Sequence, residues 1–477
     1  MGTDTRLHDS IYVGGEWLES TDARRIPVEN PATESVITQV PYGSAEDVDR
    51  AVRAARAAFP AWSATPVAER ARLLGALRDG LHNRQQELAS SITAEMGCPT
   101  KVAMTVQTGL PLQVVSSFID LAGDVDATET VGNSLILREP VGVVAAITPW
   151  NYPLHQSIAK IAPALLAGCT VVHKPSEVAP LSAFILAEVA QAAGLPPGVY
   201  NLVSGSGEVV GEALAGHPGV DMVSFTGSTR AGRRVGAVAS QTVKRVALEL
   251  GGKSANVILA DADIAAAVKV GVGNCFLNAG QTCTAWTRML APASRYDEVV
   301  ELAATAASGY VAGDPTDPGT RLGPLASRAQ RERVNGYLDR GVNDGARVAA
   351  GGRDAAGLPS RGYYVAATVF ADVDPDAAIA QEEIFGPVLS IIRYSDEDDA
   401  VRIANSTQYG LAGAVWSADR DHAVAVARRM RTGQVDINGA RFNPSAPFGG
   451  YGQSGHGREL GHHGLEEFLL IKSLQLP

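Results

Sequence analysis

Between residues 141 and 250, short apolar runs alternate with amphipathic segments, and no other feature of the sequence limits the possible folds as strongly. The runs VGVVAAIT, CTVVHK, VYNLVS, DMVSFT and RVALEL begin at residues 141, 169, 199, 221 and 245. Segments with helical periodicity lie between them, at 153–168, 179–193, 206–215 and 229–240. Continuous apolar strands separated by helices predict a parallel sheet covered on both faces, which binds ligands beyond the carboxyl ends of its strands.

A second series of strands and helices follows this region. It comprises predicted strands at 254–259 and near 287–291, 386–394, 411–416 and 433–438, and predicted helices at 263–276 and near 295–309, 326–341, 396–405 and 419–430. Residues 1–40 are predicted to form strands and turns, 46–122 helices, and 131–141 a strand broken by Pro140. We therefore predict an α/β protein with two αβ domains that meet near Gly251 and Gly252.

Charge and cysteine content exclude several classes of protein. The net charge of −11 argues against broad binding to nucleic acid or an anionic membrane. The four cysteines have no CxxC spacing and no histidine cluster beside them, so neither a disulfide framework nor a metal site is expected. The polar first ten residues contain no signal-peptide pattern, and prolines interrupt the longest apolar region, 141–172. A cytoplasmic protein is the expectation.

Two glycine-rich loops follow predicted strands. GSGEVVG at 205–211 is a variant of a dinucleotide fingerprint, and FTGSTRAG at 225–232 places Gly227 and Ser228 where a helix begins. Backbone N–H groups at such a helix start can hold a pyrophosphate. Taken alone, each loop is equally consistent with a tight turn or an N-cap serine.

Two further strand ends carry ionisable residues. Lys174 and Glu177 follow the run CTVVHK, where they can bind ribose hydroxyls; a carboxylate at Glu177 would repel a 2′-phosphate and so favours NAD over NADP. A solvated ion pair is the alternative. Glu249 lies between two leucines in a core-like strand, and an apolar pocket would raise its pKa toward that of a general base.

Cys283, in the segment NAGQTCTA, is ambiguous by itself. Most free cysteines are buried and inert, and the neighbouring threonines do not change that expectation. Reactivity must be argued from the residues around it in the fold.

Several stretches together resemble the aldehyde dehydrogenase superfamily. They are TPWNYP (148–153), KPSE (174–177), FTGST (225–229), LELGGK (248–253), GQTC (280–283), EEIFGPV (382–388), PFGG (447–450) and SGHGRE (454–459). They occur in the order and at the spacing typical of that family, and the resemblance covers essentially the whole chain.

The resemblance implies a chemistry for three residues. Cys283 would attack the aldehyde carbon as a thiolate nucleophile. Asn151, with the backbone N–H of Cys283, would stabilise the resulting oxyanion. Glu249 would activate the water that hydrolyses the thioester to a carboxylic acid.

The resemblance also implies a cofactor site for NAD, with NADP open as an alternative. Lys174 and Glu177 match the contacts to the adenosine ribose, and Gly227 and Ser228 match those to the pyrophosphate. Glu383 matches the contact to the nicotinamide ribose. Trp150 and Phe385 would lie beside the cofactor, while the GSGEVVG loop would be the lesser phosphate site.

The implied fold has a Rossmann-like NAD-binding domain (1–122 and 141–250), an α/β catalytic domain (251–445) and a small oligomerisation β-element (123–140 and 465–477). A homodimer or homotetramer is therefore expected. The partners would be a small-molecule aldehyde and a second copy of the chain, with no nucleic acid and no membrane.

The substrate pocket is the least determined part of the site. By analogy its walls include Tyr152, Gln156, Ala159, Leu277, Phe442 and Phe448, which favours an aromatic or medium aliphatic aldehyde. Arg441 could instead bind the carboxylate of a semialdehyde, although an arginine there is more often a surface residue. Gly452 and Cys98 stand where many relatives carry lysine, and Gly452 could alter the substrate entrance.

Three alternatives remain open. A CoA-acylating relative would pass the acyl group to CoA, but such relatives usually lack the base at Glu249. A non-enzymatic protein could keep the fold, although Cys283, Glu249 and Asn151 are all present. A plain cysteine hydrolase would need a histidine close to Cys283 in space.

Overall fold

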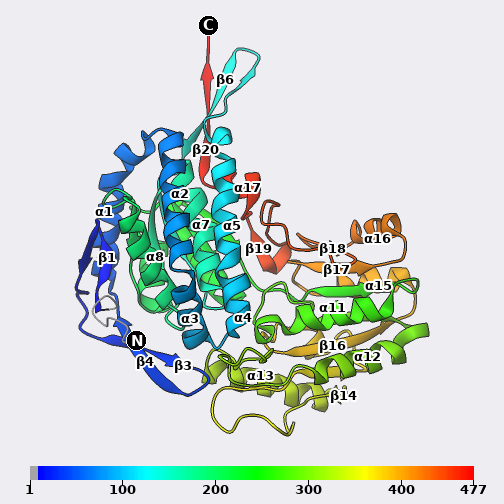
Figure 1. Ribbon diagram of the computed structural model, residues 1–477. Helices are drawn as coiled ribbons and strands as arrows, with labels where there is room; N and C mark the ends of the chain where they lie inside the picture. Colours follow the sequence, from blue (N-terminus) through cyan, green and yellow to red (C-terminus); the bar gives the residue numbers. More distant parts are fainter. Residues whose placement is uncertain (1–8) are drawn as a thin grey trace.

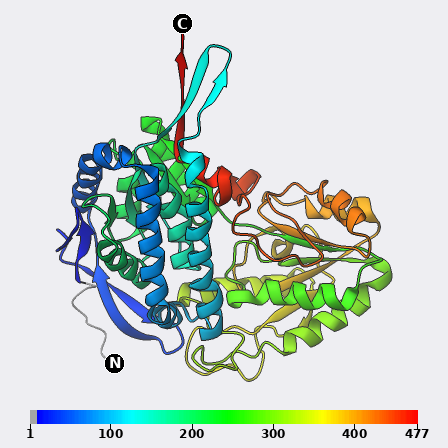
Figure 2. The ribbon, with the colours of Figure 1, turned by 45° about the horizontal axis from the view of Figure 1, so that its top comes forward.

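The computed structural model describes residues 9–477. Figure 1 shows two bodies of helices and strands side by side, with an arm that projects from one of them. The same arrangement is seen in the rotated view of Figure 2.

The first body is built on an eight-stranded sheet with the order β19-β11-β10-β7-β8-β9-β1-β2. Its strands are β1 (Ile11–Val13), β2 (Glu16–Leu18), β7 (Val143–Ile147), β8 (Thr170–Lys174), β9 (Tyr200–Leu202), β10 (Met222–Thr226), β11 (Arg245–Glu249) and β19 (Gly455–His456). The five predicted strands between 141 and 250 are confirmed, and they pair in parallel. Because Ile147 lies opposite Lys174, and Thr226 opposite Glu249, the four strands end at one edge of the sheet.

Helices cover both faces of this sheet. They are α1 (Ala45–Ser63), α2 (Val67–Asn83), α3 (Gln85–Met96), α4 (Thr100–Val102), α5 (Gly109–Asp120), α6 (Ala122–Val125), α7 (Pro153–Ala167), α8 (Leu181–Ala192), α9 (Glu212–Gly216), α10 (Thr229–Ala239) and α17 (Gly461–Glu466). The predicted helix at 206–215 begins as a π-helical turn (Gly207–Gly211) before α9.

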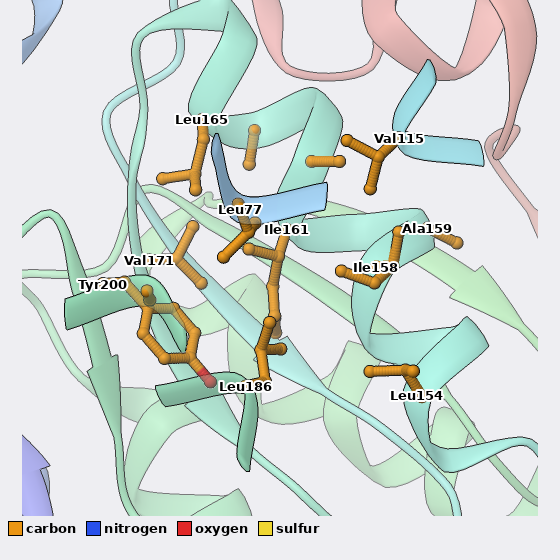
Figure 3. Close-up of a cluster of buried hydrophobic side chains, with 14 of the residues drawn as sticks. Leu77, Val115, Leu154, Ile158, Ala159, Ile161, Leu165, Val171, Leu186 and Tyr200 are labelled. Carbon is orange, nitrogen blue, oxygen red and sulfur yellow. The ribbon is translucent and has the colours of Figure 1, made fainter. Parts of the chain in front are cut away.

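Helix α7 is the centre of the first core. It begins with Pro153 and ends at Gly168, whose φ of +97° allows the left-handed turn that closes the helix. Figure 3 shows Leu154, Ile158, Ile161 and Leu165 of this helix among side chains from α2, α5 and β8. All four are at most 1% exposed, so α7 holds the loop before it, residues 148–152, against a rigid core.

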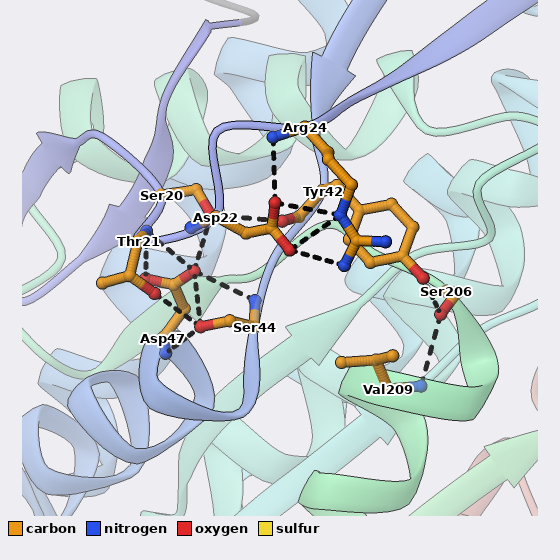
Figure 4. A network of polar contacts seen from close by, with 9 residues as sticks. All are labelled: Ser20, Thr21, Asp22, Arg24, Tyr42, Ser44, Asp47, Ser206 and Val209. Atoms are coloured by element: carbon orange, nitrogen blue, oxygen red, sulfur yellow. Dashed lines mark hydrogen bonds and ion pairs between the residues drawn. The ribbon is translucent and has the colours of Figure 1, made fainter.

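A polar network at the start of α1 ties the N-terminal strands to the GSGEVVG loop (Figure 4). The Ser44 hydroxyl accepts a hydrogen bond from the Asp47 N–H at 3.1 Å, and the Asp47 carboxylate accepts from the Ser44 N–H at 3.0 Å. Tyr42 Oη lies 3.0 Å from Ser206 Oγ, which accepts from the Val209 N–H. The hydroxyl of Ser206 therefore caps the helical turn of that loop.

The second body contains a seven-stranded sheet with the order β14-β15-β16-β13-β12-β17-β18. Its strands are β12 (Ala255–Ile258), β13 (Arg288–Pro292), β14 (Arg347–Ala350), β15 (Thr368–Ala371), β16 (Val388–Tyr394), β17 (Gly413–Trp416) and β18 (Asp436–Ile437). Its helices are α11 (Ile264–Phe276), α12 (Tyr296–Ser308), α13 (Arg328–Asn343), α14 (Ala378–Gln381), α15 (Glu397–Ala404) and α16 (Arg420–Ala427). The predicted strands and helices of this part are confirmed, and β14, β15 and the short helix α14 are additional.

The chain passes from the first sheet to the second between β11 and β12, next to Gly251 and Gly252, and returns through β19. The domain limits given above stay a prediction. Residues 25–41 form a separate hairpin of β3 (Arg25–Asn30) and β4 (Ser35–Pro41).

The projecting arm is a three-stranded sheet of β5 (Glu129–Val131), β6 (Ser134–Pro140) and β20 (Leu469–Gln475), in the order β20-β6-β5. The strand predicted at 131–141 is confirmed as β6, which begins at Ser134. A turn at Gly132, with φ of +60°, divides this segment into a hairpin, because a glycine readily adopts the left-handed conformation.

The helical run 100–120 is long and apolar enough to cross a membrane, by length and composition alone. Its residues Val114, Val115 and Phe118 are fully buried against α2 and α7. Core helices satisfy the same criterion, so this run supports no membrane assignment.

Candidate active site

A cavity of about 250 Å³ lies at the edge where β7, β10 and β11 end. Its walls are Pro149, Trp150, Asn151, Thr226, Gly227, Ser228, Leu250, Gly251, Cys283, Gln330, Arg333, Glu383 and Phe385. We call it the strand-end cavity. It brings together seven of the residues that the sequence singled out: Trp150, Asn151, Gly227, Ser228, Cys283, Glu383 and Phe385.

A second cavity of about 250 Å³ reaches Cys283 from another direction. We call it the tunnel. Its walls include Tyr152, Gln156, Leu277, Phe442 and Phe448, as predicted, together with Val106, Leu110, His155, Val270, Asn274, Thr282, Thr284, Trp286, Gln434, Asp436, Gly439 and Ala440. Ala159 is buried in α7 and is not part of the lining. Among the described residues, Cys283 alone lines both cavities.

The loop that carries Cys283 has an unusual backbone. After α11 ends at Phe276, Asn278 and Ala279 have φ of +54° and +55°, a conformation that residues with a Cβ rarely adopt. Gly280 follows with φ of +73°, and a Cβ there would overlap the carbonyl of Gly386. The surrounding structure must stabilise this turn, which presents Cys283 at the end of the loop.

Asn151 is one of the residues that hold this loop. Its side-chain Nδ2 donates to the carbonyl of Gln281 at 3.0 Å, and its own carbonyl accepts from Asn278 Nδ2 at 3.0 Å. The carbonyl also accepts from Gln107 Nε2 at 2.9 Å. The amide of Asn151 is therefore fixed beside the loop of Cys283, with one N–H not used in the bond to Gln281.

The thiol of Cys283 is partly exposed and is protonated at rest. Burial of the sulfur, and then the carboxylates of Glu383, Glu249 and Glu459, raise its pKa to about 12. Cys275, eight positions earlier, is also raised to a pKa of about 12 by burial, but it is fully buried in α11 and lies in neither cavity. Cys283 therefore differs from Cys275 in being accessible from both cavities.

Glu249, at the end of β11, is 4% exposed, and neither carboxylate oxygen has a hydrogen-bond partner. Burial, followed by the neighbouring charge of Glu459, raises its pKa well above the ordinary value. The carboxylate packs against Gly449, where a Cβ would lie 2.7 Å from Oε1. It is not part of either cavity wall, although it lies close enough to affect the thiol of Cys283.

Glu383 extends over the two glycines after β11. Its Oε1 accepts from the N–H of Gly252 at 3.0 Å, and a Cβ at Gly251 would overlap the carboxylate. Burial raises its pKa to about 7. Phe385, two residues later, has φ of +63° and packs edge-on against Trp150, with 5.4 Å between the ring centroids.

Two residues of α13 complete this wall and were missed in the sequence. Gln330 Nε2 donates to the carbonyl of Phe385 at 2.7 Å, and Arg333 Nη2 donates to the carbonyl of Glu383 at 2.6 Å. They occupy one face of a helix, three residues apart. That spacing in a polar helix is typical of a solvated face, so the sequence contained no signal for them.

Lys174, the last residue of the neighbouring strand β8, and Glu177 lie outside the strand-end cavity. Lys174 Nζ is 3.2 Å from Glu177 Oε2 and donates to the carbonyl of Pro175 at 2.9 Å. The lysine side chain is buried, which lowers its pKa, whereas the Glu177 side chain is 42% exposed. Ser228 caps α10 by accepting from the Ala231 N–H at 3.3 Å. The ion pair and the cap considered above are therefore both present.

Three other sequence features lie away from the reacting groups. Gly452 has φ of +58°, and its Cα region lies against the backbone of Gln408. Cys98 is 1% exposed and belongs to the core. Arg441 is exposed and lines neither cavity. Within residues 9–477, no group of three or more His, Cys, Asp or Glu side chains is placed to hold a metal ion.

Comparison with known proteins gives one consistent result. The sequence profile of the aldehyde dehydrogenase family matches residues 17–474. The chain is 49% identical to a 3-succinoylsemialdehyde-pyridine dehydrogenase from Pseudomonas sp over 475 residues, 98% of each chain. It is 47% identical to the geranial dehydrogenase of Castellaniella defragrans, covering 98% of this chain and 99% of that protein.

The same family is found among solved structures. A mutant of aldehyde dehydrogenase C from Pseudomonas syringae, crystallised with NAD+ and octanal, superimposes with a TM-score of 0.98 at 48% identity, covering 99% of this chain and 98% of that one. The expected fold is confirmed, and the chain belongs to the aldehyde dehydrogenase family.

Proposed function

We propose that this protein oxidises an aldehyde to a carboxylic acid, with NAD as the hydride acceptor and Cys283 as the covalent nucleophile. One observation carries the proposal: Cys283 is where the strand-end cavity and the tunnel meet. A thiol in that position is reachable by an aldehyde from one side and by a nicotinamide from the other.

The residues of the strand-end cavity fit a dinucleotide. The carboxylate of Glu383 is suited to ribose hydroxyls, and the start of α10 at Gly227 and Ser228 offers N–H groups for a pyrophosphate. Trp150 and Phe385 provide an aromatic wall for a nicotinamide. The related structure from Pseudomonas syringae holds NAD+, which supports the same cofactor here.

Lys174 and Glu177 would bind the adenosine ribose at the next strand end. The exposed carboxylate of Glu177 would accept from ribose hydroxyls and repel a 2′-phosphate, so NAD is favoured over NADP. When bound, the cofactor supplies an acceptor for the hydride that leaves the substrate carbon.

In the first half of the reaction, the Cys283 thiol gives its proton to water and Sγ forms a bond to the aldehyde carbon, which places the carbonyl electron pair on oxygen. The free N–H of Asn151 Nδ2 and the backbone N–H of Cys283 would donate to this oxyanion. Loss of hydride from the carbon then leaves a thioester on Cys283.

In the second half, Glu249 would take a proton from the water that attacks the thioester. The carbon–sulfur bond breaks and the acid leaves. The proton held by Glu249 then passes to Sγ, which restores both the thiol and the carboxylate. The unpartnered carboxylate of Glu249 now lies outside both cavities, so the side chain would turn toward Cys283 for this step. No hydrogen bond to either oxygen would need to break.

The tunnel favours an aldehyde with a medium-length apolar or aromatic body. Tyr152, Gln156, Phe442 and Phe448 would contact that body, and Phe442 and Phe448 form an aromatic pair with 6.2 Å between ring centroids. One relative is named geranial dehydrogenase and another was crystallised with octanal, which supports the assignment.

We also propose that the arm mediates a homodimer or homotetramer. Residues 123–140 and 465–477 would form this element, beside an NAD-binding domain (1–122 and 141–250) and a catalytic domain (251–445). Leu470, Ile471 and Leu474 of β20 are 46%, 66% and 39% exposed, which is typical of a surface that another copy covers. A cytoplasmic location suits the free cysteines.

NADH formation with a series of aldehydes, with NAD or NADP and with or without CoA, tests the function. We expect turnover with NAD and release of the free acid without CoA. Strict dependence on CoA would instead assign the acylating branch, and binding of NAD without turnover of any aldehyde would assign a non-enzymatic relative.

The Glu249→Gln variant tests the base. It should form one equivalent of NADH rapidly and then turn over slowly, because the thioester persists. An unchanged steady rate would exclude Glu249 as the base.

A further inference from the structure

The tunnel contains one carboxylate that the proposed reaction does not use. Asp436 is the first residue of β18, the edge strand of the seven-stranded sheet, and it lines the tunnel together with Gln434. Gln434 Nε2 donates to Asp436 Oδ1 at 2.9 Å. This bond fixes the carboxyl group and leaves Oδ2 available.

No cation of the protein compensates this carboxylate. Among the described residues, none that lines the tunnel is Lys or Arg, and Asp436 forms no ion pair. His155 in the same wall is uncharged near neutral pH, because burial lowers its pKa to about 4. Arg441, five positions beyond Asp436, is exposed and outside the lining.

The partly buried position of Asp436 also disfavours the charged form of its carboxyl group. Burial raises the pKa of Asp436, while the hydrogen bond from Gln434 opposes that rise. A carboxylate in an apolar cavity is stabilised by a donor or a cation, and here the protein supplies only one amide.

The other walls accept an apolar body. Leu110, Val270, Leu277, Trp286 and Phe448 line the tunnel together with Cys283 and Phe442. Phe442, which is 39% exposed, marks the mouth of the tunnel at the surface. A substrate that fills the tunnel would therefore contact mostly apolar side chains and, among the described residues, a single carboxylate, that of Asp436.

We propose that Asp436 selects aldehydes whose apolar or aromatic body carries a hydrogen-bond donor, a hydroxyl or a protonated nitrogen, and excludes aldehydes that carry a carboxylate. This inference rests on the proposed aldehyde oxidation and names its substrate class. It also weighs against the alternative in which Arg441 binds a semialdehyde. The reason is electrostatic: a donor pairs with the free oxygen of Asp436, whereas a second carboxylate would be buried beside it without a cation.

Para-substituted benzaldehydes of matched shape provide the test. The dimethylaminomethyl, isobutyl and carboxymethyl compounds have nearly the same size but are cationic, neutral and anionic. The hydroxymethyl and ethyl compounds form a second pair that separates a neutral donor from a charge. The measurement is kcat/KM from NADH formation with saturating NAD.

We expect the cationic compound to exceed the anionic one by about 10- to 100-fold in kcat/KM, and the hydroxymethyl compound to exceed the ethyl one by a few-fold. In Asp436→Asn both ratios should fall toward one, while the isobutyl compound keeps its rate within about threefold. Asp297→Asn is the matched control. It removes one negative charge at an exposed position on α12 and should leave every ratio unchanged.

The outcomes separate the two claims. Absence of NADH with every compound would overturn the proposed function. Two other outcomes would overturn only the role of Asp436. In the first, the isobutyl compound is oxidised, but kcat/KM is about the same for the cationic and the anionic compound. In the second, the difference between these two compounds persists in Asp436→Asn. Should that variant fail to fold, judged by its melting temperature, the ratio in the unchanged protein decides alone.

Discussion

The two cavities that meet at Cys283 are built in different ways. Most of the strand-end cavity is made by residues at or directly after the ends of the parallel strands β7, β10 and β11, and residues of α13 and of the 383–385 segment complete its wall. The tunnel is lined by residues of α5, α7, α11 and the 434–448 segment, so no single element fixes the positions of its walls. The first cavity can hold a constant ligand because the sheet fixes it, whereas the second can change one side chain at a time without disturbing the sheet.

Removing the shared residue should have the largest effect, because it removes the nucleophile at which the ligands of the two cavities would react. In Cys283→Ala we expect kcat to fall by at least ~10⁴-fold, since no other thiol is reachable from the tunnel. NAD binding, measured by quenching of tryptophan fluorescence, should persist. Cys275→Ala is the control and should keep activity within about threefold; loss of activity there alone would refute the nucleophile assignment.

The raised pKa of Cys283 predicts a strong pH dependence of its alkylation. Only the thiolate reacts with iodoacetamide, and burial with neighbouring carboxylates raises the pKa to about 12. In the free enzyme the rate should therefore increase about tenfold for each pH unit between about pH 7 and pH 10, without a plateau. The rate is followed by mass spectrometry of the Cys283 peptide. A plateau below about pH 8 would show a thiolate already stabilised at rest.

The strand-end cavity can be disturbed separately at Gly251. A Cβ there would overlap the carboxylate of Glu383, which can move only by leaving the N–H of Gly252. In Gly251→Ala we expect the KM for NAD to rise about tenfold, a loss of ~1.4 kcal/mol, with a much smaller change in the KM for the aldehyde. Gly236→Ala in α10, where a Cβ meets open space, is the control. Equal changes in both KM values would show that the two cavities are not independent.

The contrast between the cavities also explains what could be predicted from the sequence. Strands β7, β8, β10 and β11 were predictable because each contains a continuous apolar run, and Asn151, Ser228 and Glu249 lie at or shortly after the ends of these strands. The short strands β5, β14 and β15 were not, because strands of three or four residues leave too few side chains for a periodic pattern.

Some residues of the site could not be predicted from the sequence, because only their position in the folded structure brings them to the cavities. Gln330 and Arg333 belong to a polar helix face, and they reach the site only because the segment of Glu383 and Phe385 packs beside that face. Asp436 is in a two-residue strand without any motif around it. The pair Lys174 and Glu177 was found at a strand end, yet the structure places it outside the strand-end cavity, so its assignment depends on a ligand long enough to reach the next strand.

The smallest expected effect concerns the mouth of the tunnel. Phe442 is 39% exposed and packs against Phe448, so it contributes one apolar face to a bound aldehyde. In Phe442→Ala we expect the KM for a medium-chain aldehyde to rise about fivefold, equivalent to ~1 kcal/mol of lost apolar contact, and the KM for NAD to stay the same. Val311→Ala, another exposed apolar side chain outside both cavities, is the control. Initial rates measured over a range of both substrate concentrations decide between the outcomes. If only the KM for NAD rose, Phe442 would act on the cofactor side. The two cavities could then not be regarded as separate sites that meet at Cys283.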